Sequence, residues 1–206
     1  MKKIIMILLL TLVLTGCSIV RIDTSNIDTT VSVVLSKKNK LFNQVGQGYK
    51  YYLPGGVTYI DSDELNDILY CNGNYYYLFI DAINYYYQTN VEYEENSDMY
   101  YSRKFNTSDG FAHSGYLEID KKDDMYYIVF VYNYAKIEAI VEEKDIHNTV
   151  LNSAYILSTI KYNYNIVELM LTEDYFINKT GKYKDYDTTD DSGKFELQKE
   201  TIMEEG

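Results

Sequence analysis

The sequence predicts an α+β domain: a mainly antiparallel, twisted sheet that one or two helices cover. Three observations lead to this class. They are a tight-turn dipeptide between two apolar runs, a later series of short apolar segments separated by polar turns, and one amphipathic helical pattern after that series. Strands followed by a covering helix, without regular alternation of the two, are typical of the α+β class.

The first strands are predicted in a region that begins near Tyr49. Pro54-Gly55-Gly56 marks a turn, and residues 57–61 follow it as a short strand. Asn72-Gly73 then separates residues 68–70 from residues 75–87, and both turn residues tolerate the positive φ that a type I′ hairpin requires. Because residues 75–87 are mostly apolar on both alternating faces, we predict one long central strand that is covered on both sides.

A meander of three further strands is predicted over residues 116–120, 125–134 and 137–141. The polar residues between them form the connecting turns. Within the last strand, Ile137, Ala139 and Val141 alternate with charged residues, which is typical of a strand with one solvent-exposed face.

One helix is predicted from Asp145, which can cap its start, to Lys161, whose charge suits a helix C-terminus. Its apolar residues recur at three- and four-residue steps: Ile146, Val150, Leu151, Ala154, Leu157 and Ile160. Residues 166–171 fit either a strand or a second short helix. The meander and the run AYILSTI at 154–160 together resemble the end of the PsbP-like fold, an antiparallel sheet flanked by helices, and this resemblance implies no functional residues.

The first 17 residues have the parts of an export signal. Lys2 and Lys3 precede the apolar residues 4–14, which are too few to cross a bilayer because a spanning helix takes about 20 residues. Leu14-Thr15-Gly16-Cys17 ends this stretch and resembles the lipobox of bacterial lipoproteins. An uncleaved anchor, or a secretory signal with a chance cysteine, is the alternative.

The lipobox resemblance implies an order of processing. The Cys17 thiol takes up a diacylglyceryl group, signal peptidase II cuts before Cys17, and the new amino terminus can receive a further acyl chain such as palmitate. Each buried methylene contributes about 0.8 kcal/mol, so two or three chains hold a protein firmly on a membrane. We therefore expect a lipid-anchored protein on the extracytoplasmic face of the cell membrane.

The predicted organisation has four parts. They are a signal peptide at residues 1–16, the lipidated cysteine and a polar tether at 17–30, a single globular domain at 31–177, and an acidic disordered tail at 178–206. The formal net charge is −12, and removal of Lys2 and Lys3 with the leader makes it −14. Nucleic acid and anionic lipid headgroups repel such a surface, so membrane lipid is reached only through acylated Cys17 and no nucleic-acid partner is expected.

No catalytic, metal or cofactor site is predicted. Cys71 with His113 or His147 is the obvious nucleophile pair, but no cysteine-hydrolase signature surrounds Cys71. Two histidines and one free cysteine do not make a recognisable zinc site. The acidic stretch 185–193 lacks a glycine at the position that an EF-hand loop requires.

Tyrosine is the unusual residue of this chain, with 25 in 206 residues. Its commoner role is in the core and its rim, whereas tyrosines in less regular segments are better candidates for contact with a partner. The candidates are Tyr49, Tyr51, Tyr52, Tyr93, Tyr100 and Tyr101. We predict a non-enzymatic binding or accessory lipoprotein with a protein partner in the envelope. The alternatives are an envelope hydrolase acting on glycan or peptide, for which spacing alone cannot place two opposed carboxylates, and a small-ligand-binding lipoprotein.

Overall fold

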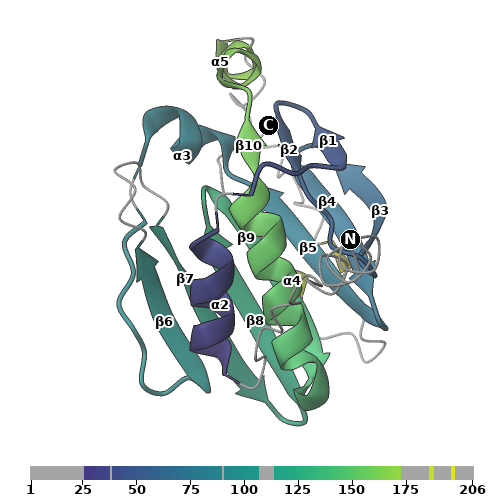
Figure 1. Ribbon diagram of the computed structural model, residues 1–206, viewed down its shortest axis with the longest axis vertical. Helices are drawn as coiled ribbons and strands as arrows, with labels where there is room; N and C mark the ends of the chain where they lie inside the picture. Colours follow the sequence, from purple (N-terminus) through teal and green to yellow (C-terminus); the bar gives the residue numbers. More distant parts are fainter. Residues whose placement is uncertain are drawn as a thin grey trace, which may run out of the picture.

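The computed structural model is an antiparallel sheet of seven strands with two helices, α2 and α4, packed on one face (Figure 1). It describes residues 26–37, 39–89, 91–106 and 114–172, and the backbone of 186–187 and 196–197. The predicted α+β class with a mainly antiparallel sheet is confirmed.

The seven-stranded sheet has the order β3-β4-β5-β9-β8-β7-β6. The bounds of its strands are β3 Thr58–Asp63, β4 Asn66–Cys71, β5 Asn74–Ile80, β6 Tyr101–Asn106, β7 Ser114–Lys122, β8 Met125–Tyr132 and β9 Ala135–Glu142. A small sheet has the order β1-β2-β10, with β1 Gln44–Gly46, β2 Tyr49–Tyr51 and β10 Lys161–Tyr162. The helices are α2 Ile27–Leu35, α3 Ala82–Tyr87, α4 Ile146–Thr159 and α5 Tyr164–Thr172, and a 3₁₀ turn, Glu143–Asp145, precedes α4.

Two tight hairpin turns set the register of the seven-stranded sheet. Asn72 and Gly73 have φ values of 50° and 92°, and they join β4 to β5 as predicted. Asn133 and Tyr134, with φ values of 53° and 56°, join β8 to β9 in the same way. Positive φ at both central residues matches the right-handed twist of the flanking strands, and the predicted meander β7-β8-β9 is confirmed.

The single long strand predicted over residues 75–87 is wrong. The strand β5 ends at Ile80, and Asp81 then caps α3 because its carboxylate accepts a hydrogen bond from the Asn84 backbone N–H at 2.9 Å. An N-cap of this kind satisfies a backbone donor that a continuing strand would pair with its neighbour. The chain therefore turns away from the sheet at Asp81.

The solvent-exposed face predicted for β9 is also wrong. Lys136 and Glu138 are buried, and their side chains form an ion pair of 2.6 Å. The strand β9 lies between β5 and β8 in the middle of the sheet. The large neighbouring side chains of Tyr77 and Phe79 lie opposite these two residues in the register and help to exclude water.

The first helix begins earlier than the predicted domain boundary at residue 31. Asn26 caps α2, since its side-chain oxygen accepts a hydrogen bond from the Thr29 N–H at 3.0 Å. Val31 and Val34 then pack into the core. Part of the segment expected to be tether is therefore helical. The predicted tail at 178–206 lies outside the described residues, apart from the antiparallel pair β11 Tyr186–Asp187 and β12 Glu196–Leu197.

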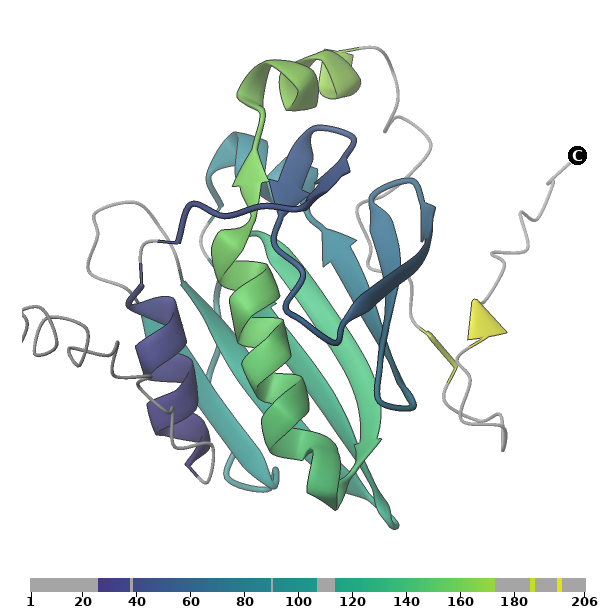
Figure 2. The same cartoon turned by 45° about the vertical axis from the view of Figure 1, so that its right-hand side comes forward.

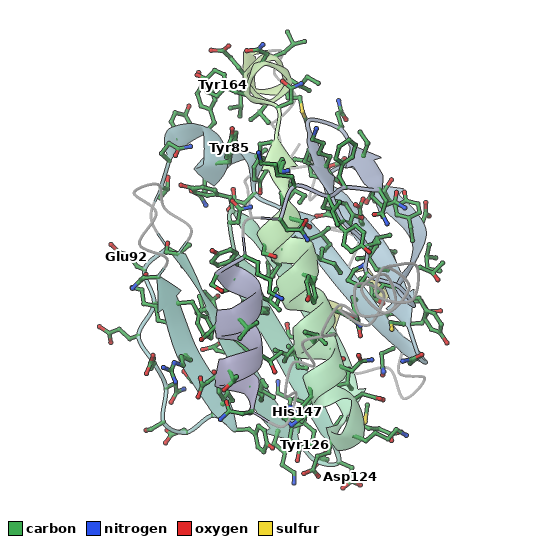
Figure 3. The ribbon with its side chains drawn as sticks, in the orientation of Figure 1. Tyr85, Glu92, Asp124, Tyr126, His147 and Tyr164 are labelled. Carbon is green, nitrogen blue, oxygen red and sulfur yellow. The ribbon has the colours of Figure 1, made fainter. Side chains whose placement is uncertain are left out.

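Different helices, strands and turns lie at the lower and the upper end of the domain (Figures 1 and 2). The lower end holds the turn between β7 and β8 and the start of α4, where His147, Tyr126 and Asp124 lie (Figure 3). The first turn of α2 also lies there, because Asp28 accepts a hydrogen bond from Tyr101 Oη at 2.6 Å at the start of β6. The upper end comprises residues 39–43, the small sheet and α5.

Candidate functional site

A pocket of about 380 Å³ lies at the upper end, between the small sheet and the first turn of α5. It forms because α4 is followed directly by β10, which pairs with β2, and then by α5. The residues that line it include Val45, Lys50, Lys161, Tyr162, Asn163 and Tyr164. This volume is at the small end of the range for ligand sites.

Gly48 and Asn163 hold the floor of the pocket together. Gly48 has a φ of +81° in the tight turn between β1 and β2, a conformation that a side chain disfavours. Its carbonyl accepts a hydrogen bond from the Asn163 N–H at 2.8 Å, and the Asn163 carbonyl in turn accepts one from the Val167 N–H at 3.0 Å. The start of α5 is thereby fixed against the β1–β2 turn.

A buried carboxylate joins the small sheet to the seven-stranded sheet. The Asp67 carboxylate on β4 accepts hydrogen bonds from Tyr49 Oη at 2.9 Å and Tyr51 Oη at 2.7 Å, and the two rings stack with centroids 6.1 Å apart. Burial raises the pKa of Asp67, although the two hydroxyls oppose that shift. Burial, and then the nearby carboxylate, raise the pKa of both tyrosines. Tyr49 and Tyr51 therefore point into the protein as anchors of β2, and only Tyr49 also borders the pocket.

The other predicted tyrosines are spread over the molecule. Tyr93 stacks on Tyr116 with ring centroids 4.0 Å apart, and its hydroxyl donates to Glu118 at 2.9 Å; burial raises the pKa of Tyr93 to about 12. Tyr52 and Tyr101 are half-buried, whereas Tyr100 is exposed. The six tyrosines do not form one surface, and their contact with a partner stays a prediction.

The upper end carries an apolar patch that the sequence analysis did not single out. Its exposed side chains are Leu41, Phe42, Val45, Tyr164, Ile166 and Leu169. On α5 the buried residues Val167 and Met170 alternate with the exposed residues Ile166 and Leu169. The sequence offers one indication of this patch, which is that α5 is apolar on more than the face it buries. That indication was missed because residues 166–171 fitted a strand as well as a helix.

Lysines gather at the same end. Lys50 and Lys161 lie directly opposite each other in the register of β2 and β10, and Lys50 Nζ lies 4.1 Å from the centre of the Phe42 ring. Burial, followed by the charges of Lys50 and Lys40, lowers the pKa of Lys161.

The described residues contain no nucleophile–base pair at the positions that the sequence suggested. Cys71 is buried, and its sulfur accepts a hydrogen bond from Asn152 Nδ2 at 3.6 Å. His147 lies in the first turn of α4 at the lower end, and His113 is outside the described residues. No group of three or more histidine, cysteine, aspartate or glutamate side chains in the described part of the chain could hold a metal ion.

Residues 1–18 match the family model of the prokaryotic membrane lipoprotein lipid attachment site. The protein is a membrane-anchored lipoprotein. The cysteine within the matched range is Cys17, and it lies outside the described residues. Comparisons with curated proteins and with solved structures find no match. Among the helices that the structure describes, none is long and apolar enough to cross a membrane.

Proposed function

We propose that this lipoprotein is a non-enzymatic binding component of the cell envelope, held by acylated Cys17 on the extracytoplasmic face of the membrane. Its domain presents the apolar patch to a protein partner. The observation that carries this proposal is the position of the patch, at the end of the domain opposite the point where the anchored chain enters.

The length of the anchoring segment favours this orientation. Cys17 and Asn26 are nine residue steps apart along the chain, which reach at most about 30 Å when fully extended. Along the domain, α4 rises about 21 Å over its 14 residues, β10 adds about 7 Å, and α5, which runs across the top, adds a diameter of about 10 Å. A chain that leaves the lower end therefore does not extend past the far side of the upper end, so a domain that stands on its lower end presents the patch away from the membrane.

The composition of the patch favours a protein partner. Contiguous apolar side chains on a water-facing surface mark interaction sites, and an apolar centre with a polar rim is typical of protein interfaces. Confinement to one membrane surface also raises the effective concentration of partners held there. Because Lys50 and Lys161 lie beside the patch, a partner with an apolar contact surface and an acidic rim suits it.

Site-specific photo-crosslinking in intact cells tests this proposal. A photoreactive residue at Leu169 is expected to give a discrete protein adduct, whereas the same residue at Lys144, which is exposed at the lower end, gives none. The adduct should disappear in a Val45→Asp background, which places a charge in the patch, and in Cys17→Ala, which removes the anchor. Lipid adducts at Leu169, or the same adducts at both positions, would contradict the proposed surface.

A further inference from the structure

We propose that the pocket at the upper end is a binding site for a small organic anion, a molecule bearing a phosphate or carboxylate group that Lys50 and Lys161 hold. Val45, Tyr164 and Ile166 belong both to the apolar patch and to the lining of the pocket. The inference nevertheless does not depend on the protein partner proposed above, because it rests on the paired lysines and the concave shape of the pocket.

The first argument is the arrangement of the two lysines. Lys161 lies directly opposite Lys50 on neighbouring strands. Side chains in such pairs start about 5 Å apart, and like charges placed there destabilise a sheet. Lys40 adds a third positive charge near Lys161, and the resulting repulsion lowers the pKa of Lys161 beyond the effect of burial.

The second argument is the contrast with other lysines of the same protein. Lys136, Lys144 and Lys122 each have a carboxylate within 4.0 Å, on Glu138, Glu142 and Asp120 respectively. The chain has 31 acidic residues against 19 basic ones, so a carboxylate partner is easily supplied. Among the described residues, none forms an ion pair with Lys50 or Lys161. Lys50 lies over the Phe42 ring, but no described carboxylate pairs with either lysine, so an anion from outside would relieve their repulsion.

The third argument is the concave shape and the chemistry of the remaining lining. Asn163 and Asn165 place amide groups beside the lysines, and Tyr162 and Tyr164 contribute aromatic rings. Tyr162 is held rigidly, because its hydroxyl donates to the carbonyl of Asn133 at 2.9 Å and its ring stacks on Tyr85 with centroids 4.0 Å apart. Figure 3 shows Tyr164 and Tyr85 at this end of the molecule.

These features define the ligand class. A volume of about 380 Å³ suits one small molecule rather than a polymer. Ammonium groups bind phosphate and carboxylate as point charges, and amides hydrogen-bond to hydroxyl groups on the body of the ligand. The first turn of α5 lies in the same lining, and the positive end of its helix dipole adds to the field of the lysines, although Asn163 accepts the hydrogen bonds of the Ile166 and Val167 N–H groups. A phosphorylated or carboxylated sugar meets these conditions.

Isothermal titration of the full-length lipoprotein in detergent tests the site. The probes are inorganic phosphate, glucose 6-phosphate and glucuronate, with glucose as the neutral control, all at one ionic strength. We expect saturable binding of at least one anion and none of glucose. The double variant Lys50→Gln/Lys161→Gln should weaken binding at least tenfold. Lys144→Gln removes a lysine at the lower end that is paired with Glu142, and it should leave binding unchanged.

A charge-reversal variant tests whether loss of anion binding is caused by loss of folding. Lys161→Glu places a carboxylate opposite Lys50, so this variant should unfold at the same or a higher temperature than the wild type while losing anion binding. Preference among the three probes distinguishes phosphate from carboxylate. The proposal is overturned if no anion binds saturably, or if the double variant binds as well as the wild type. Binding only to vesicles that contain anionic lipid would also overturn it, because the lysines would then face a membrane surface.

Discussion

The layer between α4 and the seven-stranded sheet and the upper end of the domain contain similar side chains in opposite surroundings. Phe130 on β8 is fully buried against the helices, whereas Phe42 at the upper end is 49 % exposed. Val150 on α4 has no exposed surface, whereas Val45 on β1 is 72 % exposed. The comparison teaches that an apolar residue in this protein serves folding in one region and is available for binding in the other.

The two regions differ in how fully helices cover the strands beneath them. In the main layer, α2 and α4 cover one face of the sheet, and the side chains between them form one continuous core. In the upper end, a helix of nine residues packs on strands of two or three residues. So short an arrangement buries one side of α5 and leaves the other side in water.

The largest expected effect is that of truncating an aromatic side chain in the main layer. Phe130→Ala leaves a cavity beneath α4 and should lower the free energy of unfolding by about 3–5 kcal/mol. Phe42→Ala removes the same atoms from the upper end and should lower the free energy of unfolding by only about 1–2 kcal/mol, since Phe42 is already half exposed and its contact with Lys50 is a surface cation–π interaction. Urea unfolding of the two variants beside the wild type measures both effects. Equal losses would show that the upper end is also part of the folding core.

Local turn chemistry explains why much of the main layer could be predicted from the sequence. Asn72 and Gly73 both favour positive φ, so the hairpin between β4 and β5 was evident. The helix α4 was evident from its apolar spacing. The signals that failed depend on distant partners. Lys136 and Glu138 indicate solvent exposure by their own chemistry, and only the neighbouring strands β5 and β8 bury their ion pair.

The upper end could not be predicted because its elements are too short to show a period. The strand β10 has two residues, and it brings Lys161 beside Lys50 across more than a hundred residues of sequence. From the sequence, Tyr49 and Tyr51 were predicted to contact a partner. In the structure both of their hydroxyls donate hydrogen bonds to the Asp67 carboxylate. No feature local to either tyrosine indicates that distant acceptor.

A smaller loss of stability is expected from a change at Asp67, whose hydrogen bonds to Tyr49 and Tyr51 join the two regions. Asp67→Asn replaces a carboxylate that accepts two tyrosine hydrogen bonds with an amide that has one carbonyl oxygen. At low pH the protonated Asp67 carboxyl accepts from one tyrosine hydroxyl and donates its own proton to the other, whereas the amide brings a second N–H that has no acceptor in the core, so the free energy of unfolding should fall by about 1–3 kcal/mol. Tyr51→Phe removes one of these hydrogen bonds together with its hydroxyl and should be less destabilising.

The pH dependence of this variant gives a second measurement. Burial raises the pKa of Asp67 in the folded protein above its ordinary value near 3.8. A raised carboxyl pKa means that the folded state binds the proton more tightly than the unfolded state, so the contribution of Asp67 is largest below that value and falls as pH rises through the folded pKa. The difference between wild type and Asp67→Asn should therefore narrow over this range. If the difference in the free energy of unfolding widens as pH rises, the folded state favours the charged form of Asp67 instead.

The smallest expected effect is that of an isosteric change at the most exposed valine. Val45→Thr keeps the shape of the side chain and exchanges a methyl for a hydroxyl, and because Val45 is in water its free energy of unfolding should stay within about 0.5 kcal/mol of wild type. Val150→Thr buries the same hydroxyl beneath α4 and should be destabilising by about 1–3 kcal/mol. Thermal and urea unfolding of the matched pair measure the difference. If Val45→Thr is as destabilising as Val150→Thr, the upper end is covered in solution by another part of the protein or by a second copy. If it is neutral, Val45 contributes nothing measurable to folding, as expected for a side chain of the proposed binding surface.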